Sequence, residues 1–176
     1  MTTTIEYALM AGASYIDTRN PINRFPTPQN WVSFNHQSRD SGFEAISFTN
    51  STDIVISFAG TNPNSLFNPD NAANIGLATG FGSDQLLQAA EYYLQVKAVN
   101  PNAVITLTGH SLGGGLAALI GVFFGNQAVT FDQAPFANTA ELNLLTPDVA
   151  ANLRTYLSTR LDSNGNRIYA DAALAG

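Results

Sequence analysis

The chain contains no cysteine, which excludes disulfide bonds and thiol chemistry. Basic residues are also scarce: there are seven Lys and Arg among 176 residues, and the formal net charge is −6. So few cations cannot form the basic stripe that nucleic-acid binding requires. The same shortage disfavours electrostatic docking on an anionic membrane. We therefore expect neither nucleic acid nor an anionic bilayer surface as an electrostatic partner.

Long apolar runs are missing as well. The longest, Leu116 to Phe124, is interrupted by Gly121 and falls short of the roughly 18 residues that a membrane-spanning helix needs. The N-terminus lacks the basic residues followed by an apolar core that mark a cleaved export signal. Apolar residues nevertheless make up 45% of the chain, which is enough for a folded core. We expect a single domain over residues 1–176 without a transmembrane segment.

Apolar periodicity predicts that helices alternate with strands. The expected helices lie at 2–16, 83–99, 112–125 and 146–161, and the expected strands at 43–49, 53–59, 104–107 and 128–131. This order predicts a mostly parallel, three-layer α/β sheet. The strands at 43–49 and 53–59 are joined by a short polar turn, so we expect them to form an antiparallel hairpin at its N-terminal edge.

Two segments between these elements show no regular pattern. Residues 20–30 contain three prolines and are expected to run extended over the surface, before Trp31, Val32 and Phe34 anchor the chain to the core. Residues 62–82 are rich in Asn, Pro and Gly, and at about 20 residues they exceed the usual length of a connection. They form either a lid or binding loop, or a solvated insertion, and the sequence does not choose between these.

The segment 103–115, AVITLTGHSLGGG, carries the most specific motif. Its residues 109–113, GHSLG, match the G-x-S-x-G pattern of a nucleophile elbow. In that motif a serine stands on a sharp strand-to-helix turn, where Gly109 and Gly113 would supply clearance for the backbone. The alternative is a glycine-rich turn without chemistry. The β-prone run before Ser111 and the apolar helix pattern after it favour the elbow.

An ester hydrolase also needs N–H donors for the negative charge that develops on the substrate carbonyl oxygen. The sequence predicts one donor at Leu112, the residue after the serine, at the start of a helix. The second is predicted at Thr61, because the apolar strand at 53–59 is followed by Gly60, which permits close approach. For Thr61 the alternative is a plain turn that ends the strand.

The base and the acid that would activate Ser111 are not evident, although a serine hydroxyl needs both. Of the two histidines, His110 is expected to point away from the serine into packing or a hydrogen bond. His36 precedes the serine, whereas elbow hydrolases have the chain order serine, acid, histidine. We therefore expect His36 to be a surface or core residue rather than the base. Asp132 follows the strand at 128–131 and is either the acid or a turn residue. The catalytic triad is therefore incomplete within this chain.

Four segments resemble the class 3, fungal-type lipases, and most of all the bacterial lipase-like domains found in large exported proteins. They are 54–61 (IVISFAGT), 83–98, 104–117 (VITLTGHSLGGGLA) and 128–135 (AVTFDQAP). The resemblance covers roughly residues 5–136. It departs from the family at Ala59, where an arginine often stands.

The resemblance implies an α/β-hydrolase fold and hydrolysis of acyl lipids or similar esters through an acyl-enzyme intermediate. Ser111 is then the nucleophile, and Thr61 and Leu112 form the oxyanion hole. The catalytic aspartate and histidine are implied to lie on later elements, and Asp132 maps to a position where relatives often have glycine. We therefore expect this chain to be the N-terminal portion of such a domain. A C-terminal segment or a companion chain would complete the site by supplying Asp and His.

No metal or organic cofactor is needed for this chemistry. The exported relatives often carry calcium-binding regions, and residues 162–166, DSNGN, resemble an oxygen-rich calcium loop. They lack the closing bidentate acid, so we expect a β-turn. The resemblance implies a secreted bacterial protein, and the sequence leaves a cytoplasmic location open.

Two further hypotheses stay open. The first is a catalytically inactive module of the same fold that is used for binding, which the missing histidine supports. The second is a protease or thioesterase on the same fold, because the choice of acyl group depends on the lid and the pocket rather than on the fold. The intact elbow counts against the binding module.

Overall fold

The computed structural model describes residues 1–176 except 18, 61–82, 134–153, 156 and 169–176. The loop expected at 62–82 and most of the helix expected at 146–161 therefore lie outside the described residues. Within the described part, no helix is both long enough and apolar enough to cross a bilayer.

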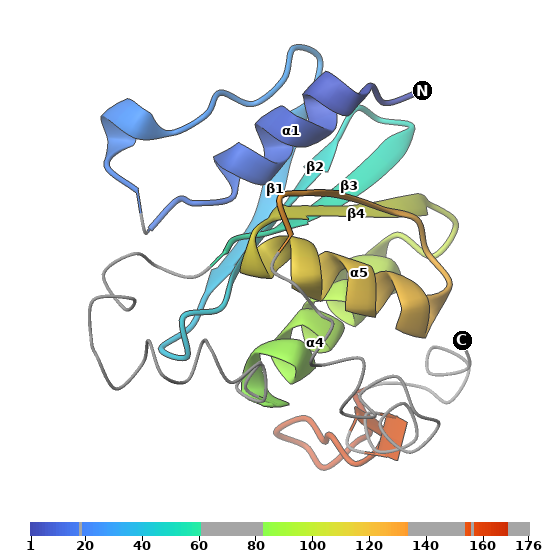
Figure 1. The fold of residues 1–176 in the computed structure, drawn as a ribbon. Helices are drawn as coiled ribbons and strands as arrows, with labels where there is room; N and C mark the ends of the chain where they lie inside the picture. The colour runs from blue at the N-terminus through green and yellow to red at the C-terminus, as the bar shows by residue number, and fades with distance from the viewer. Residues whose placement is uncertain (18, 61–82, 134–153, 156, 169–176) are drawn as a thin grey trace.

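The described strands form one five-stranded sheet in the order β1-β2-β3-β4-β5 (Figure 1). Its strands are β1 (Val32–Ser38), β2 (Glu44–Thr49), β3 (Asp53–Phe58), β4 (Val104–His110) and β5 (Ala128–Phe131). The pairs β1–β2 and β2–β3 are antiparallel, and the pairs β3–β4 and β4–β5 are parallel. The hairpin predicted at 43–49 and 53–59 is thus confirmed as β2 and β3.

The sheet is mixed within the described residues, rather than mostly parallel as predicted. The difference comes from β1, which the sequence analysis took for an irregular anchor segment. Its polar residues gave no apolar alternation, yet it pairs along the whole edge of β2. Of the expected anchors, Trp31 is buried at 6% exposure and Phe34 packs partly against the core, whereas Val32 is 63% exposed and anchors nothing.

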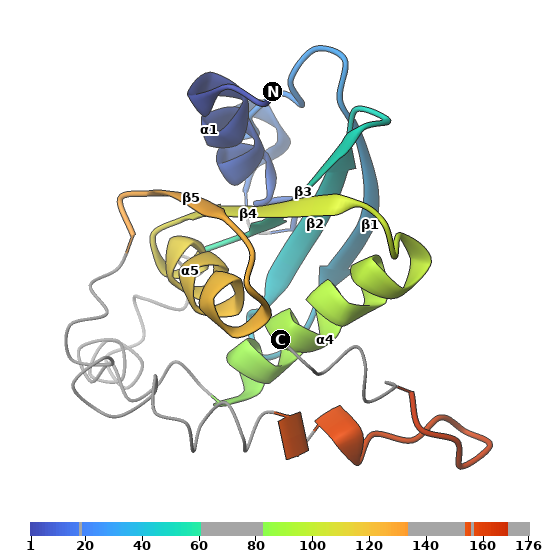
Figure 2. The same cartoon turned by 90° about the vertical axis from the view of Figure 1, so that its right-hand side faces the viewer.

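In the described part of the chain, α1 (Thr4–Ala13), α4 (Ser83–Val99) and α5 (Leu112–Phe124) cover the two faces of the sheet (Figures 1 and 2). Helix α1 lies on one face, and α4 and α5 lie on the other. A short 3₁₀ turn, η1 (Pro21–Asn23), follows α1. The described part of the chain is therefore an α/β fold with a helical layer on each side of its sheet.

Helix α1 begins and ends at identifiable hydrogen bonds. Thr3 and Glu6 form a reciprocal capping box, in which the Glu6 carboxylate accepts the Thr3 N–H at 2.7 Å. The helix stops at Ala13, short of the predicted end. The N–H groups of Ile16 and Asp17 each donate to Oε1 of Glu44 at 2.7 Å, and the Ile16 N–H also donates to the Ser14 carbonyl at 3.0 Å. A buried side chain of β2 thus fixes the backbone that follows α1.

The larger hydrophobic core fills the space between the sheet and helices α4 and α5. Its fully buried members include Phe58, Tyr92, Leu94, Leu107 and Leu116. A smaller cluster between the sheet and α1 contains Met10, Trp31, Ile46, Phe48 and Val55. The two clusters use alternate residues of the central strands, as expected when both faces of a sheet are covered.

Residues 162–166 form the predicted turn. An antiparallel bridge pairs Leu161 with Arg167 across it. The Asp162 carboxylate accepts the N–H groups of Asn164 and Asn166 at 2.8 and 2.9 Å, and these hydrogen bonds lower the pKa of that carboxyl group. The oxygen-rich sequence is explained by turn formation.

Candidate active site

Ser111 lies alone between a strand and a helix, because β4 ends at His110 and α5 begins at Leu112. Its backbone has φ +55° and ψ −124°, a left-handed φ that costs a non-glycine residue conformational energy. The turn is held in this shape from both sides. The Ser111 N–H donates to the Phe131 carbonyl at 3.1 Å, and the Ser111 carbonyl accepts the Gly115 N–H at 3.2 Å. The sharp bend predicted from the GHSLG motif is therefore present, and its serine is half-buried and makes no side-chain capping bond.

The two motif glycines are required by the close approach of backbone segments. A Cβ atom at Gly113 would lie 2.0 Å from the carbonyl oxygen of Phe58, and one at Gly109 would lie 2.4 Å from the Gly113 carbonyl group. Both contacts are with backbone atoms, which cannot rotate away. The elbow thus brings the start of α5 directly against the end of β3.

The end of β3 also lies against the serine. A Cβ atom at Gly60 would be 2.9 Å from the His110 carbonyl oxygen and 3.3 Å from Cβ of Ser111. Thr61, the next residue and predicted oxyanion donor, lies outside the described residues. Leu112, the other predicted donor, is the first residue of α5, where N–H groups have no partner within the helix.

Tyr15 is a residue of this region that the sequence analysis missed. Its hydroxyl oxygen lies 3.0 Å from Nδ1 of His110 and beside Gly60, where an added Cβ atom would be 2.5 Å from it. The side chain is buried at 5% exposure, and this desolvation raises the pKa of the phenol, so the hydroxyl stays protonated at neutral pH. Tyr15 therefore ties the end of α1 to the residues that flank Ser111.

Neither histidine is placed as a base for Ser111 by a hydrogen bond within the described residues. The ring of His110 bonds to Tyr15 through Nδ1, which agrees with its predicted role in packing or hydrogen bonding. His36 lies on β1, three strand positions from β4 in the sheet, a distance of roughly 14 Å at ordinary strand spacing. Its Nε2 atom lies 3.2 Å from Oε1 of Glu44.

Asp132 follows β5 and is exposed, with φ +42°. A left-handed φ of this kind is adopted most easily by glycine, which fits the position to which the family resemblance maps it. The neighbouring hydrogen bond, from the Thr130 hydroxyl to Oε1 of Gln133 at 2.8 Å, closes a local turn. The backbone geometry is that of a turn residue, and a role for Asp132 as the acid stays a prediction.

Replacement of Tyr15 by Phe is expected to destabilise the fold by about 1–3 kcal/mol, because it leaves Nδ1 of His110 without its partner. Denaturant unfolding of both proteins measures the difference. Tyr7→Phe is the matched control. That tyrosine also lies on α1, and its hydroxyl makes no hydrogen bond to the described residues. Equal stability of the Tyr15→Phe variant and the unmodified chain would show that the contact contributes nothing.

Comparison with known proteins places this geometry in a family. The family model described as "Phospholipase-like: Tle-like phospholipase domain" matches residues 10–152. The extracellular phospholipase A1 of Serratia liquefaciens is 40% identical over 111 residues, which cover 63% of this chain and 33% of that protein. The chain therefore spans about a third of the length of that relative.

Among solved structures, the native lipase–propeptide complex of Rhizomucor miehei aligns with a TM-score of 0.46 and 16% identity, over 74% of this chain and 51% of that one. The family model covers the segments that build the candidate site, which are Tyr15, strands β3, β4 and β5, and the elbow at Ser111. The chain therefore belongs to the Tle-like phospholipase domain family of lipolytic hydrolases.

Proposed function

We propose that the chain provides the nucleophile and the oxyanion hole of a serine carboxylic-ester hydrolase that acts on phospholipid acyl esters. The observation that carries the proposal is the backbone of Ser111, which is held at φ +55° between β4 and α5 and has backbone packed against the flanking glycines. Strained conformations of this kind persist where the surrounding structure enforces them, and they cluster at active sites. The names of the family and of the Serratia relative support the phospholipid substrate.

In the proposed reaction, Oγ of Ser111 attacks the acyl carbonyl carbon while a base accepts the hydroxyl proton. The carbonyl oxygen becomes negatively charged and is bound by the backbone N–H groups of Leu112 and Thr61. Collapse of the intermediate breaks the ester bond, releases the lyso-phospholipid alcohol with a proton from the base, and leaves the acyl group on Ser111. Water then hydrolyses the acyl-enzyme to a fatty acid.

Helix α5 contributes directly to this chemistry. Ser111 stands at its N-terminus, where the first-turn N–H groups and the helix dipole favour negative charge. The packing of Gly60 against Ser111 supports the assignment of the second donor to the following residue, Thr61. Loss of one such donor typically lowers turnover about 10²–10³-fold.

We assign the base to a later segment of the protein or to a companion chain, because both histidines have other partners in the described residues. The acid is either Asp132 or a residue of that same segment or companion chain. The Serratia relative is named an extracellular enzyme, and we propose secretion for this protein on the same ground. The proposed unit is thus the N-terminal portion of an α/β-hydrolase-like domain.

The function is tested by measuring fatty-acid release from phosphatidylcholine vesicles by the protein in its natural form, with any companion chain present. We expect release that scales with protein concentration. A binding module of the same fold is the second candidate, favoured by the hydrogen bonds that both histidines make to residues other than Ser111. Vesicle binding without fatty-acid release would favour the binding module and contradict the hydrolase.

A further inference from the structure

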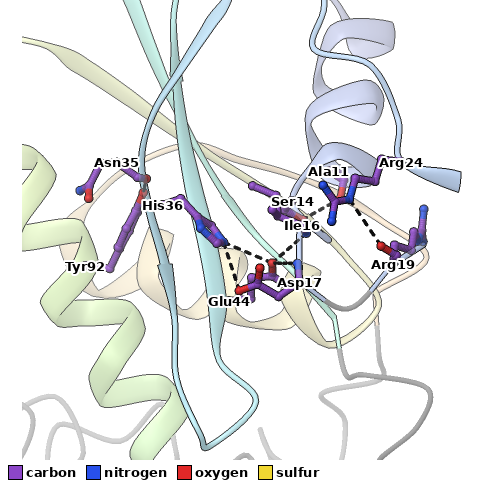
Figure 3. A network of polar contacts seen from close by, with 10 residues as sticks. All are labelled: Ala11, Ser14, Ile16, Asp17, Arg19, Arg24, Asn35, His36, Glu44 and Tyr92. Atoms are coloured by element: carbon purple, nitrogen blue, oxygen red, sulfur yellow. Dashed lines mark hydrogen bonds and ion pairs between the residues drawn. The ribbon is translucent and has the colours of Figure 1, made fainter. Parts of the chain in front are cut away.

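Three side chains that can bind a metal ion meet on the α1 face of the sheet (Figure 3). They are Asp17 after α1, His36 on β1 and Glu44 on β2, and their ligand atoms all lie within 4.8 Å of one another. Nε2 of His36 is 3.2 Å from Oε1 of Glu44 and 4.0 Å from Oδ2 of Asp17. We propose that this cluster is a binding site for a divalent transition-metal ion of the Zn²⁺ class.

A β-bulge places His36 in this cluster. The register of β1 against β2 shifts between Phe34, which faces Ser47, and His36, which faces Ile46, so Asn35 is an extra residue with φ +51°. Without this insertion, strict alternation would put His36 on the same face as Phe34, toward α4. Bulges commonly re-aim a side chain in this way.

The bulge is held in place by a side chain of α4. The Tyr92 hydroxyl donates to the Asn35 carbonyl and lies 2.9 Å from the Ser47 hydroxyl. Tyr92 is fully buried, so the core itself fixes the extra residue. The fold therefore determines that His36 is oriented toward Glu44.

The donor set and its geometry fit a transition-metal ion. Bonds of 2.0–2.2 Å in a tetrahedral site separate neighbouring ligand atoms by about 3.4 Å. The His36–Glu44 separation of 3.2 Å is close to this value, and the His36–Asp17 separation of 4.0 Å must shorten by about 0.6 Å. The third separation, at most 4.8 Å, must shorten by up to about 1.4 Å, which a rotation of the exposed Asp17 side chain can supply. Imidazole favours Zn²⁺ and similar ions over Mg²⁺ and Ca²⁺, which prefer oxygen ligands alone. The two carboxylates balance the charge of a divalent ion, and three protein ligands leave a position for water.

The buried ligand is already oriented by the backbone. Glu44 is 2% exposed, and its Oε1 accepts the N–H groups of Ile16 and Asp17. Hydrogen bonds of this kind commonly orient ligating carboxylates. Since Ile16 and Asp17 directly follow Tyr15, a bound ion would clamp the segment that carries Tyr15 to β1 and β2. We infer a structural role for the ion, independent of the ester chemistry.

The test uses the fact that the chain has only two histidines, so its imidazole NMR spectrum contains two ring systems. Zn²⁺ is titrated into the ¹⁵N-labelled chain, prepared without a polyhistidine tag. We expect the His36 ring signals to change and to saturate at one equivalent, while those of His110 stay in place. Mg²⁺ at the same concentration should leave both rings unchanged.

Two variants and one control assign the site. His36→Ala and Asp17→Asn should each weaken Zn²⁺ binding at least about tenfold in calorimetric titration, and the rise in melting temperature with Zn²⁺ should disappear. Asp40→Asn, which alters an exposed acid in the turn between β1 and β2, should bind Zn²⁺ as the unmodified chain does. The proposal would be overturned if Zn²⁺ left the His36 signals unchanged or changed the signals of both rings equally. It would also be overturned if both variants bound Zn²⁺ as tightly as the unmodified chain.

Discussion

Replacement of Ser111 by Ala is expected to lower the turnover of phospholipid esters by about 10³–10⁶-fold, because no other described group stands where the nucleophile must be. The expected loss is large since the alanine variant keeps the helix N-terminus and the substrate contacts but cannot form the acyl-enzyme. Fatty-acid release from phosphatidylcholine vesicles measures the effect.

The matched control for this substitution is Ser51→Ala. Ser51 is an exposed serine in the turn between β2 and β3 and also has a left-handed backbone, with φ +76°. It therefore reproduces any effect of alanine at positive φ without touching the elbow. We expect both variants to keep the stability of the unmodified chain within about 1 kcal/mol, and the control to keep its turnover. Full activity of the Ser111→Ala variant would exclude Ser111 as the nucleophile.

Replacement of Gly113 by Ala is expected to destabilise the chain by about 3 kcal/mol or more, or to prevent folding. A methyl group there would lie 2.0 Å from the Phe58 carbonyl oxygen, so α5 and β3 must separate, and shifts of this kind in a packed core are costly. The sign of the change in the free energy of unfolding tests the close contact. In a helix with room for the added methyl group, the same substitution would raise the free energy of unfolding by up to about 1 kcal/mol.

Gly114→Ala is the graded control for the Gly113 variant, since it alters the next residue of the same helix. Its added methyl group would lie 3.0 Å from Cβ of Gln133 and 3.1 Å from the Gly109 carbonyl oxygen, contacts that a shift of a few tenths of an ångström relieves. We expect a smaller loss in urea-unfolding measurements. A Gly113→Ala variant as stable as the Gly114→Ala variant would contradict the close approach on which the elbow depends.

The elements that the sequence predicted are those with local signals. The hairpin of β2 and β3 follows from two apolar runs around a polar turn, and α4 follows from its apolar periodicity. The elbow follows from five consecutive residues, 109–113, whose spacing needs no tertiary information. In each case the chemical reason lies within a short stretch of chain.

The features that the sequence did not predict depend on contacts between distant segments. Strand β1 has apolar residues only before its bulge, at Val32 and Phe34, and is polar after it, so its alternation is broken, and only pairing with β2 shows that it is a strand. Tyr15 meets His110 across 95 positions of the chain, and no local pattern could link them. The same holds for the cluster of Asp17, His36 and Glu44, whose members come from the segment after α1, from β1 and from β2.

The central claim is that Ser111 is a reactive nucleophile, and covalent labelling tests it most directly. The natural protein, with any companion chain, is treated with a fluorophosphonate, and its intact mass and labelled peptide are determined. The account predicts the addition of one phosphonyl group per chain, located on Ser111 and absent from the Ser111→Ala variant. An unmodified mass, or a label on another residue, would contradict it.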